Sequence, residues 1–277
     1  MKFEHTLTGN WENAFRGLRH PMESYSRSDS EFGLVQPYGD EDLNVTTKWL
    51  IKDYPKLEEG SSEWVDKSIE RSDWIVKNGV IKYDKLNDTC EYAFIGPNDM
   101  DLAKRMIKAG TPNDKFLRQI FVSVDITAPL YWWKEMDTYK VATVANSTST
   151  MHKLASTPIT LDCFETDDMS KLSDINVPLV GMTESLDKCV NVIIDTCEGL
   201  RQKYLATKDK RYWKELIRWL PESWLQTRTW TANYSTLRNI IHWRRGHKLS
   251  EWNQFIDWCK TLPYADDLLF YAQTNEN

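Results

Sequence analysis

Residues 185–204 carry apolar side chains at the spacing of an α-helix, and this is the longest regular stripe in the chain. A helix with one apolar stripe needs a second surface to cover it, so we expect it to pack against the core or a partner subunit. Residues 121–127 instead alternate apolar and polar side chains, as a half-buried β-strand does. The two patterns predict an α+β fold, with a helical majority packed on a small antiparallel sheet. The helical stripe consists of Leu186, Val190, Ile193, Cys197, Leu200 and Tyr204.

Start, stop and turn residues mark the other expected elements. Asn98 or Asp99 is placed to cap a helix that Gly110 ends, and Ser250 is placed to cap a helix through Lys260. The remaining expected elements are helices at 42–54, 63–76, 213–220 and 229–247, a loop at 24–42, a two-stranded excursion at 79–96, a helix from Leu130 that leads into an irregular or helical segment through Met151, and a strand at 159–164.

Composition excludes several classes of protein. Of the 277 residues 41% are hydrophobic, which is enough apolar surface to offset the entropy of ordering the chain and excludes a disordered polymer. No apolar run approaches the roughly 20 residues that a bilayer requires, so no membrane partner is expected. The 35 basic and 41 acidic side chains give a net charge of −6, so nucleic-acid binding is not expected either.

The cysteines and the opening residues favour a cytoplasmic protein. The first residues have no apolar core, so no secretory signal is visible. The five cysteines are scattered and form no Cys-x-x-Cys pair, which favours reduced thiols packed as small hydrophobic residues. No metal-ligand spacing, nucleophile elbow or glycine-rich phosphate loop occurs, so no metal site is expected.

Hydroxyl and amide side chains are concentrated in residues 137–152, among them Asn146, Ser147 and Ser149. Such a run can line a pocket that hydrogen-bonds a heterocycle or a phosphate. It can equally be a turn whose side chains cap the next helix through bonds to the backbone. The residues alone favour the second interpretation.

Residues 230–248 show a second concentration of polar groups, on an expected helix. Asn233 and Arg244 fall on one stripe of that helix, and Asn239 and Trp243 fall on the adjacent stripe. Two amides, an indole and a guanidinium on neighbouring stripes suit a flat aromatic ring and an anion. The alternative is a basic helix end that complements the helix dipole, which we prefer for Arg245 and Lys248. The packed side of this helix consists of Leu237, Ile240 and Ile241.

The same C-terminal segment has a distinctive order of residues. It contains Leu-Pro at 220–221 and Trp-Thr-Ala-Asn at 230–233, followed by Asn239 and Arg244. In residues and spacing it resembles the flavin-dependent thymidylate synthases. That family has a Leu-Pro, then Trp-Thr-x-Asn, then an Asn and an Arg on one helix.

The hydroxyl-rich segment resembles the family signature, Arg-His-Arg followed by Ser-x-Asn-Glu-x-Ser-x-Arg-Tyr. Asn146 and Ser149 keep its Asn-x-x-Ser spacing, and Ser147 stands at the Glu. The Arg-His-Arg positions are Tyr-Lys-Val at 139–141. The resemblance implies FAD contacts from Gln119, Lys140, Asn233, Asn239 and Trp243, and substrate contacts from Asn146, Ser147, Ser149 and Arg244, with Ser149 and Arg244 as the catalytic residues.

The resemblance implies a single α+β domain over residues 1–277, with a family-like core at 111–255 and an N-terminal insertion at 24–96. It implies a homotetramer that methylates a pyrimidine deoxynucleotide, most simply dUMP to dTMP, with methylenetetrahydrofolate and NADPH as co-substrates. Because the Arg-His-Arg motif is absent, the alternative is a non-catalytic or repurposed nucleotide-binding member of the same fold. A third interpretation, a single-strand nucleic-acid binder using Trp243 and the basic residues beside it, is opposed by the acidic net charge.

Overall fold

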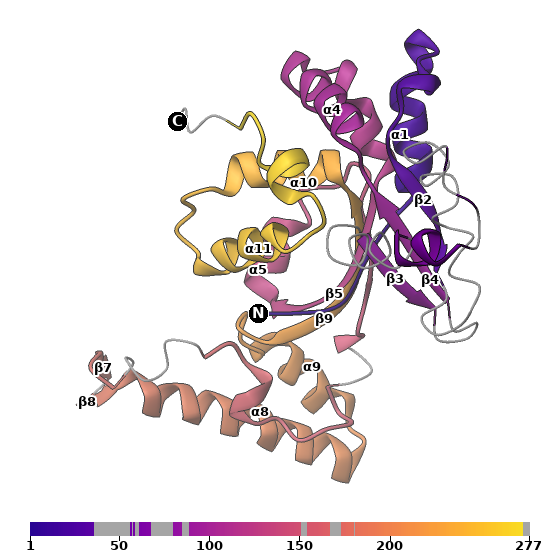
Figure 1. Cartoon of the computed structure of the whole chain (residues 1–277). Helices are drawn as coiled ribbons and strands as arrows, with labels where there is room; N and C mark the ends of the chain where they lie inside the picture. The colour runs from indigo at the N-terminus through magenta and orange to yellow at the C-terminus, as the bar shows by residue number, and fades with distance from the viewer. Residues whose placement is uncertain are drawn as a thin grey trace. The chain divides into compact units, whose positions relative to one another are not determined.

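Figure 1 shows a computed structural model of the chain. The chain divides into two compact units. Unit 1 consists of Met1–Thr6, Ser123–Ala232 and Arg244–Phe255, and unit 2 consists of Leu7–Val122, Asn233–Trp243 and Ile256–Asn277. The interpretation of the chain as a single domain stays a prediction. The structure describes residues 1–35, 56, 58, 61–67, 80–84, 89–150, 154–166, 173–179 and 181–273.

A four-stranded sheet runs through unit 1 in the order β1-β5-β9-β6. Its central strand β5 (Phe121–Pro129) confirms the alternating pattern of the sequence, because every second side chain from Val122 to Ala128 is buried. The edge strand β6 (Val144–Ser147) pairs antiparallel with β9 (Leu225–Asn233). The other edge is β1 (Lys2–Gly9).

Aromatic residues fill the core of unit 1. The helix α5 (Leu130–Met136) contributes Trp132 and Trp133, whose ring centroids lie 4.9 Å apart. The helix α11 (Ser250–Lys260) contributes Trp252, whose ring lies 5.0 Å from that of Trp132. All three indoles are buried, so part of the high tryptophan content forms the core.

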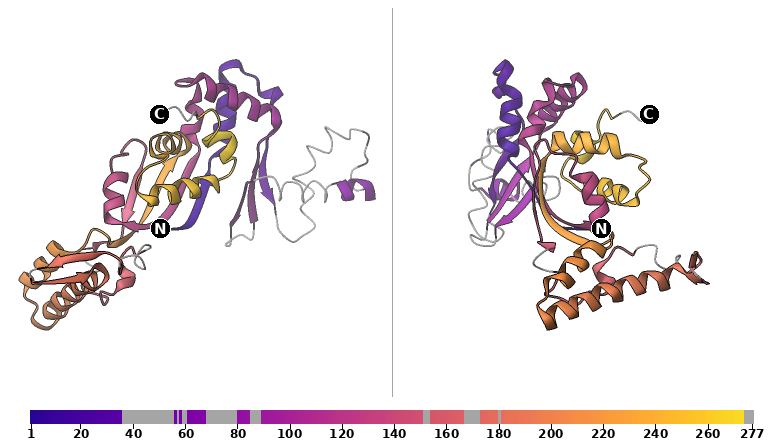
Figure 2. Two further views of the ribbon diagram at one scale, coloured as in Figure 1. Left: turned by 90° about the vertical axis from the view of Figure 1, so that its left-hand side faces the viewer. Right: turned by 180° about the vertical axis from the view of Figure 1, so that it is seen from behind.

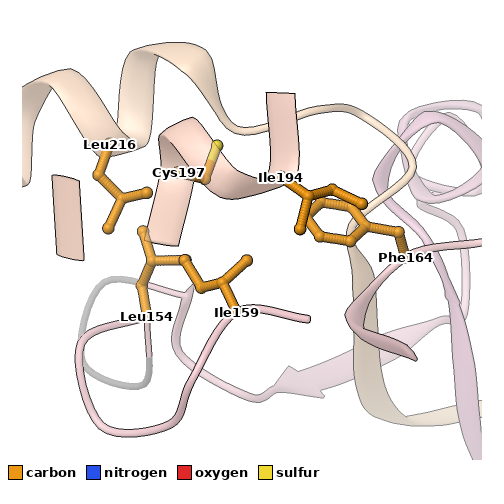
Figure 3. Packing of buried hydrophobic residues seen from close by; sticks show 6 residues of the cluster. All are labelled: Leu154, Ile159, Phe164, Ile194, Cys197 and Leu216. Carbon is orange, nitrogen blue, oxygen red and sulfur yellow. The ribbon is translucent and has the colours of Figure 1, made fainter. Parts of the chain in front are cut away.

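Two long helices form a second layer of unit 1 and lie side by side, α8 (Leu186–Thr207) and α9 (Lys210–Trp219) (Figures 1 and 2). The predicted helix at 185–204 is confirmed, with Ser185 at its N-cap. The helix buries Ile194. The sequence pattern predicts that Ile193 is buried instead, but Ile193 is 45% exposed. The hairpin of β7 (Asn176–Leu179) and β8 (Met182–Ser185) precedes α8. Figure 3 shows the small core beneath these helices, formed by Leu154, Ile159, Phe164, Ile194, Cys197 and Leu216.

A buried ion pair ties α8 to the segment before it. Arg201 is 5% exposed in its side chain, and its Nε and Nη2 donate to the two oxygens of Glu198 at 2.7 and 2.6 Å. Glu198 also accepts the backbone N–H of Ile159 at 2.8 Å, and Arg201 donates to the carbonyl of Ala155 at 3.2 Å. Because the two side chains also hydrogen-bond to the backbone at Ala155 and Ile159, the pair holds this segment against α8.

Unit 2 packs α1 (Trp11–Arg19) and α4 (Pro97–Ala109) on the 3₁₀ helix η3 (Asn113–Gln119). The π-helix η5 (Ala265–Leu269) packs against α4. Its three-stranded antiparallel sheet has the order β2-β4-β3, from β2 (Glu31–Val35), β3 (Val80–Asp84) and β4 (Thr89–Phe94). The predicted excursion at 79–96 is therefore confirmed as a strand pair. The short 3₁₀ helices η1 (His20–Met22) and η2 (Tyr25–Arg27) follow α1.

A buried charge network joins the segments of unit 2. Asp99 is fully buried and accepts from Arg19 Nε at 2.6 Å and from the hydroxyls of Ser28 and Ser30 at 2.6 Å each. Asp29 accepts the first backbone N–H groups of α4, including that of Asp99 at 3.1 Å. The prediction that Asn98 or Asp99 caps α4 is therefore wrong. The N-cap is Gly96, and the carboxylate comes from a residue far away in sequence.

Four further expectations are wrong. The strand expected at 159–164 is the 3₁₀ helix η4 (Leu161–Cys163), with a single bridge from Phe164 to Trp224. The irregular or helical segment after α5 contains the strand β6, and the loop expected at 24–42 contains β2. The helix expected at 229–247 is the end of β9 followed by α10 (Tyr234–Arg244).

The helix signals near residue 60 are only partly within the described residues. Residues 62–67 are helical, in part of the helix expected at 63–76. The helix expected at 42–54 lies outside the described residues. Across the described ranges, no helix combines the length and the low polarity that crossing a bilayer demands.

Candidate functional site

Asn233 is the last residue of β9 and precedes α10. Its side chain is 6% exposed, and its Oδ1 accepts the backbone N–H of Thr236 at 2.9 Å. This is the bond that an N-cap residue makes. Asn233 therefore starts the helix. The prediction that Asn233 and Arg244 share one helical stripe is wrong, because Asn233 lies at the end of β9.

Asn239 and Trp243 lie one turn apart on α10 and are both exposed. Trp243 is 62% exposed, and its ring lies 4.9 Å from that of His242 in an edge-on arrangement. Leu237, Ile240 and Ile241 are fully buried on the packed side, as predicted. The helix thus presents an amide and an indole on one open face.

Arg244 ends α10 and is held in a cage within unit 1. Its Nε donates to the hydroxyl of Tyr139 at 2.9 Å, and its Nη1 donates to Glu135 Oε2 at 2.7 Å. The guanidinium lies 4.4 Å from the ring of Trp252, which donates its own Nε1–H to Glu135. With 16% of its side chain exposed, Arg244 is a half-buried cation in a fixed orientation.

The hydroxyl-rich segment lies along the edge of the unit 1 sheet. Asn146 and Ser147 are exposed on β6, opposite Thr229 and Arg228 of β9. Ser149 follows the strand and is half-buried. Lys140 lies in the turn before β6 and is exposed. Residues 144–147 of the segment are thus an edge strand with exposed polar side chains, whereas the helix-cap interpretation of the residues after it stays a prediction.

Gln119 lies in unit 2, at the end of η3. It is exposed, and its side-chain oxygen lies against α1 at Gly17, where an added Cβ would stand 2.9 Å from it. Its backbone carbonyl accepts from Asn10 Nδ2 at 2.8 Å. The amide of Gln119 is therefore packed on a glycine of α1.

Sequence reasoning missed Arg228. It is 15% exposed in its side chain and lies with its guanidinium 4.2 Å from the ring centroid of Trp133. Its Nη1 donates to Asp137 at 2.7 Å and its Nε donates to Gln226 Oε1 at 2.9 Å. The alternation of β9 places it on the face of the buried Trp230, a signal that the predicted helix at 229–247 hides because Arg228 lies just before it.

Two further groups of unit 1 have perturbed acidity. The pKa of Tyr131 is raised, because its hydroxyl is partly buried and donates to the buried carboxylate of Glu251. The pKa of Asp125 is lowered, because the hydroxyl of Thr229 donates to it at 2.5 Å. Neither group touches a predicted site residue in the described contacts. Within the described ranges, no three His, Cys, Asp or Glu side chains gather as metal ligands do.

Comparison with known proteins tests the fold. No protein-family model matches the chain, and no curated protein is similar to it in sequence. A crystal structure of thymidylate synthase X from Helicobacter pylori with FAD and dUMP matches with a TM-score of 0.51 at 14% identity, covering 100% of both chains. Another structure of this flavin-dependent enzyme from the same organism, also complexed with FAD and dUMP, covers 87% of the chain and 99% of its own, with a TM-score of 0.46 at 14% identity. The chain therefore has the α+β fold of the flavin-dependent thymidylate synthases.

Proposed function

We propose that the chain is a flavin-dependent enzyme that methylates a pyrimidine deoxynucleotide, most simply dUMP to dTMP, with methylenetetrahydrofolate and NADPH as co-substrates. The observation that carries the proposal is the open face of α10, where Asn239 and Trp243 lie exposed on the helix that ends in Arg244. A whole-chain likeness to a protein crystallised with FAD and dUMP supports it.

The residues of α10 fit a flavin. The 62% exposed indole of Trp243 offers a flat apolar surface for ring stacking, and the Asn239 amide one turn earlier offers both a donor and an acceptor. Asn233 contributes by starting the helix, because its Oδ1 is occupied by the backbone. Lys140 of unit 1, an exposed cation, and Gln119 of unit 2, an exposed amide, are proposed as further FAD contacts on the family resemblance alone. Reduced flavin supplies a hydride when it is bound.

The nucleotide contacts are proposed for unit 1. Asn146, Ser147 and Ser149 provide an amide and hydroxyls along the sheet edge, which suit the base and the phosphate. The Nη2 group of Arg244 makes no hydrogen bond within the described part of the chain, whereas Nε and Nη1 are held by Tyr139 and Glu135. A guanidinium fixed in this way can stabilise charge that develops on a uracil oxygen, which makes carbon 5 more nucleophilic.

The chain is also proposed to act as a homotetramer. Large apolar side chains are exposed on the helical layer of unit 1, including Val192 at 64% and Trp219 at 67%. Burial of such groups between subunits is favourable. Light scattering on the purified protein tests the assembly, and a monomer at working concentration would contradict it.

The alternative function is nucleotide binding without catalysis. The observation that favours it is that Tyr139 stands at the first arginine of the family's Arg-His-Arg motif. Its hydroxyl accepts a hydrogen bond from Arg244. In that case the chain would bind dUMP without FAD and would transfer no hydride from a reduced flavin.

The decisive experiment is NADPH oxidation by the purified, FAD-supplemented chain, with and without dUMP and methylenetetrahydrofolate. We expect oxidation that dUMP stimulates and a dTMP product that depends on all components. Trp243→Ala should lose FAD binding, whereas the control variant Tyr25→Ala, which also removes an exposed aromatic side chain of unit 2, should keep it. Binding of dUMP with no uptake of FAD by the wild-type chain would support the alternative.

A further inference from the structure

Arg228 is built into unit 1 in the same way as Arg244, although no predicted role involves it. Each guanidinium lies over a tryptophan, Trp133 at 4.2 Å for Arg228 and Trp252 at 4.4 Å for Arg244. Each guanidinium is also paired with a carboxylate. Arg244 pairs with Glu135 near the end of α5, and Arg228 pairs with Asp137 directly after that helix. A stacked, half-buried arginine has few rotamers left to lose on binding, so it is prepared to hold an anion.

The contacts of Arg228 leave one edge of the guanidinium open. Nη1 and Nε are used by Asp137 and Gln226, and across the described residues Nη2 makes no hydrogen bond. Gln226 is itself fixed, because its Nε2 donates to the carbonyl of Thr148 at 2.9 Å. Asp137 is the weak partner, since its side chain is 55% exposed while that of Arg228 is 15% exposed. A ligand anion can therefore displace the carboxylate without disturbing the stacking.

A residue with a hydroxyl group is the cross-strand partner of Arg228. Ser147 is the register partner of Arg228 in the β6–β9 pair, so the two Cα atoms stand about 4.5–5.5 Å apart and their side chains share one face of the sheet. Ser147 is exposed. A guanidinium and an exposed hydroxyl on paired residues of neighbouring strands suit the oxygens of a phosphate monoester.

We propose that Arg228, together with Ser147, binds the phosphate group of the nucleotide substrate. This inference rests on the proposed function, because it assigns a residue of the same substrate site. The position of Arg228 on β9 supplies positive charge beside a segment in which Tyr139 and Val141 carry none. The ligand class is a nucleoside monophosphate, and the nucleoside without its phosphate should not depend on Arg228.

The test compares dUMP with deoxyuridine by calorimetry on the full chain. Arg228→Gln should weaken dUMP binding ~10-fold or more, as loss of a charge-assisted contact does, and should leave deoxyuridine binding unchanged. Asp137→Asn should leave dUMP affinity unchanged or raise it, because the competing carboxylate is removed. Ser147→Ala should weaken dUMP binding by a few-fold. The matched surface pair on α4, Arg105→Gln and Asp101→Asn, should change neither affinity.

The different responses expected of Arg228→Gln and Asp137→Asn distinguish binding from a structural role. If Arg228 and Asp137 only stabilise the fold, both substitutions weaken both ligands alike, and that result overturns the inference. Should Arg228→Gln fail to fold, Asp137→Asn and Ser147→Ala still test it, since neither removes the stacking on Trp133. Unchanged dUMP affinity in Arg228→Gln refutes the inference and spares the proposed function. No dUMP binding by the wild-type chain refutes both, and Arg228-dependent dUMP binding without FAD uptake refutes only the enzyme proposal.

Discussion

Replacement of Glu198 by Gln tests whether the ion pair on α8 stabilises unit 1. The Glu198 carboxylate accepts hydrogen bonds from Arg201, from the backbone N–H of Ile159 and from Gln202. These bonds, that of Arg201 most of all, lower the pKa of Glu198 from 4.5 to about 2. This lowering of the Glu198 pKa corresponds to ~3 kcal/mol of stabilisation of the charged form. Because the Glu198 side chain is 25% exposed, solvent screening reduces this, and we expect a loss of about 2–3 kcal/mol at pH 7.

The pH dependence gives this prediction its sign. The folded pKa of Glu198 is below its unfolded value, so its stabilisation is fully present above about pH 4.5 and is lost as the pH falls towards 2. Urea unfolding of the wild type and Glu198→Gln across this range should show a difference that shrinks towards zero in acid. The control Glu215→Gln removes an exposed pair with Arg218 and should cost less than ~1 kcal/mol. A Glu198→Gln difference that is constant with pH, or no larger than that of the control, would refute the reasoning.

Three further predictions follow from other contacts. Asn233→Ala removes the cap of α10 and should lower the free energy of unfolding by ~1 kcal/mol in a urea titration, whereas Asn233→Asp, which keeps the acceptor, should not. Asp99→Ala leaves the buried Arg19 without its acid and should cost ~3–5 kcal/mol in thermal unfolding, while Asp101→Asn on the exposed face of α4 should cost under ~0.5 kcal/mol; similar melting temperatures for the two would contradict this. Trp243→Ala should abolish FAD fluorescence quenching with little change in stability, because the side chain is largely exposed; retained quenching would exclude it from the flavin contact.

Sequence periodicity correctly predicts the helices and strands in which apolar side chains recur at a regular spacing. The α8 helix, the strand β5 and α11 appear at the expected residues, because one buried face recurs with a clear period. The junction of β9 and α10 was misread. The predicted helix at 229–247 includes the Trp-Thr-Ala-Asn run, although Thr229 and Thr231 favour a strand and Asn233 favours a cap.

Long-range contacts could not be predicted from one sequence. The cap of α4 comes from Asp29, and the orientation of Arg244 comes from Glu135, each far from its partner along the chain. Arg228 becomes a candidate only when the register places it beside Ser147. Such contacts depend on how strands and helices are paired, which local spacing does not encode.

The central claim is that the open face of α10 takes a flavin. Titration of FAD into the purified full chain, followed by visible absorbance and flavin fluorescence, tests it most directly. We predict saturable binding with about one FAD per chain, quenched fluorescence, and bleaching of the bound flavin by NADPH that dUMP accelerates. Unchanged FAD spectra at saturating protein, with or without dUMP, would contradict the claim.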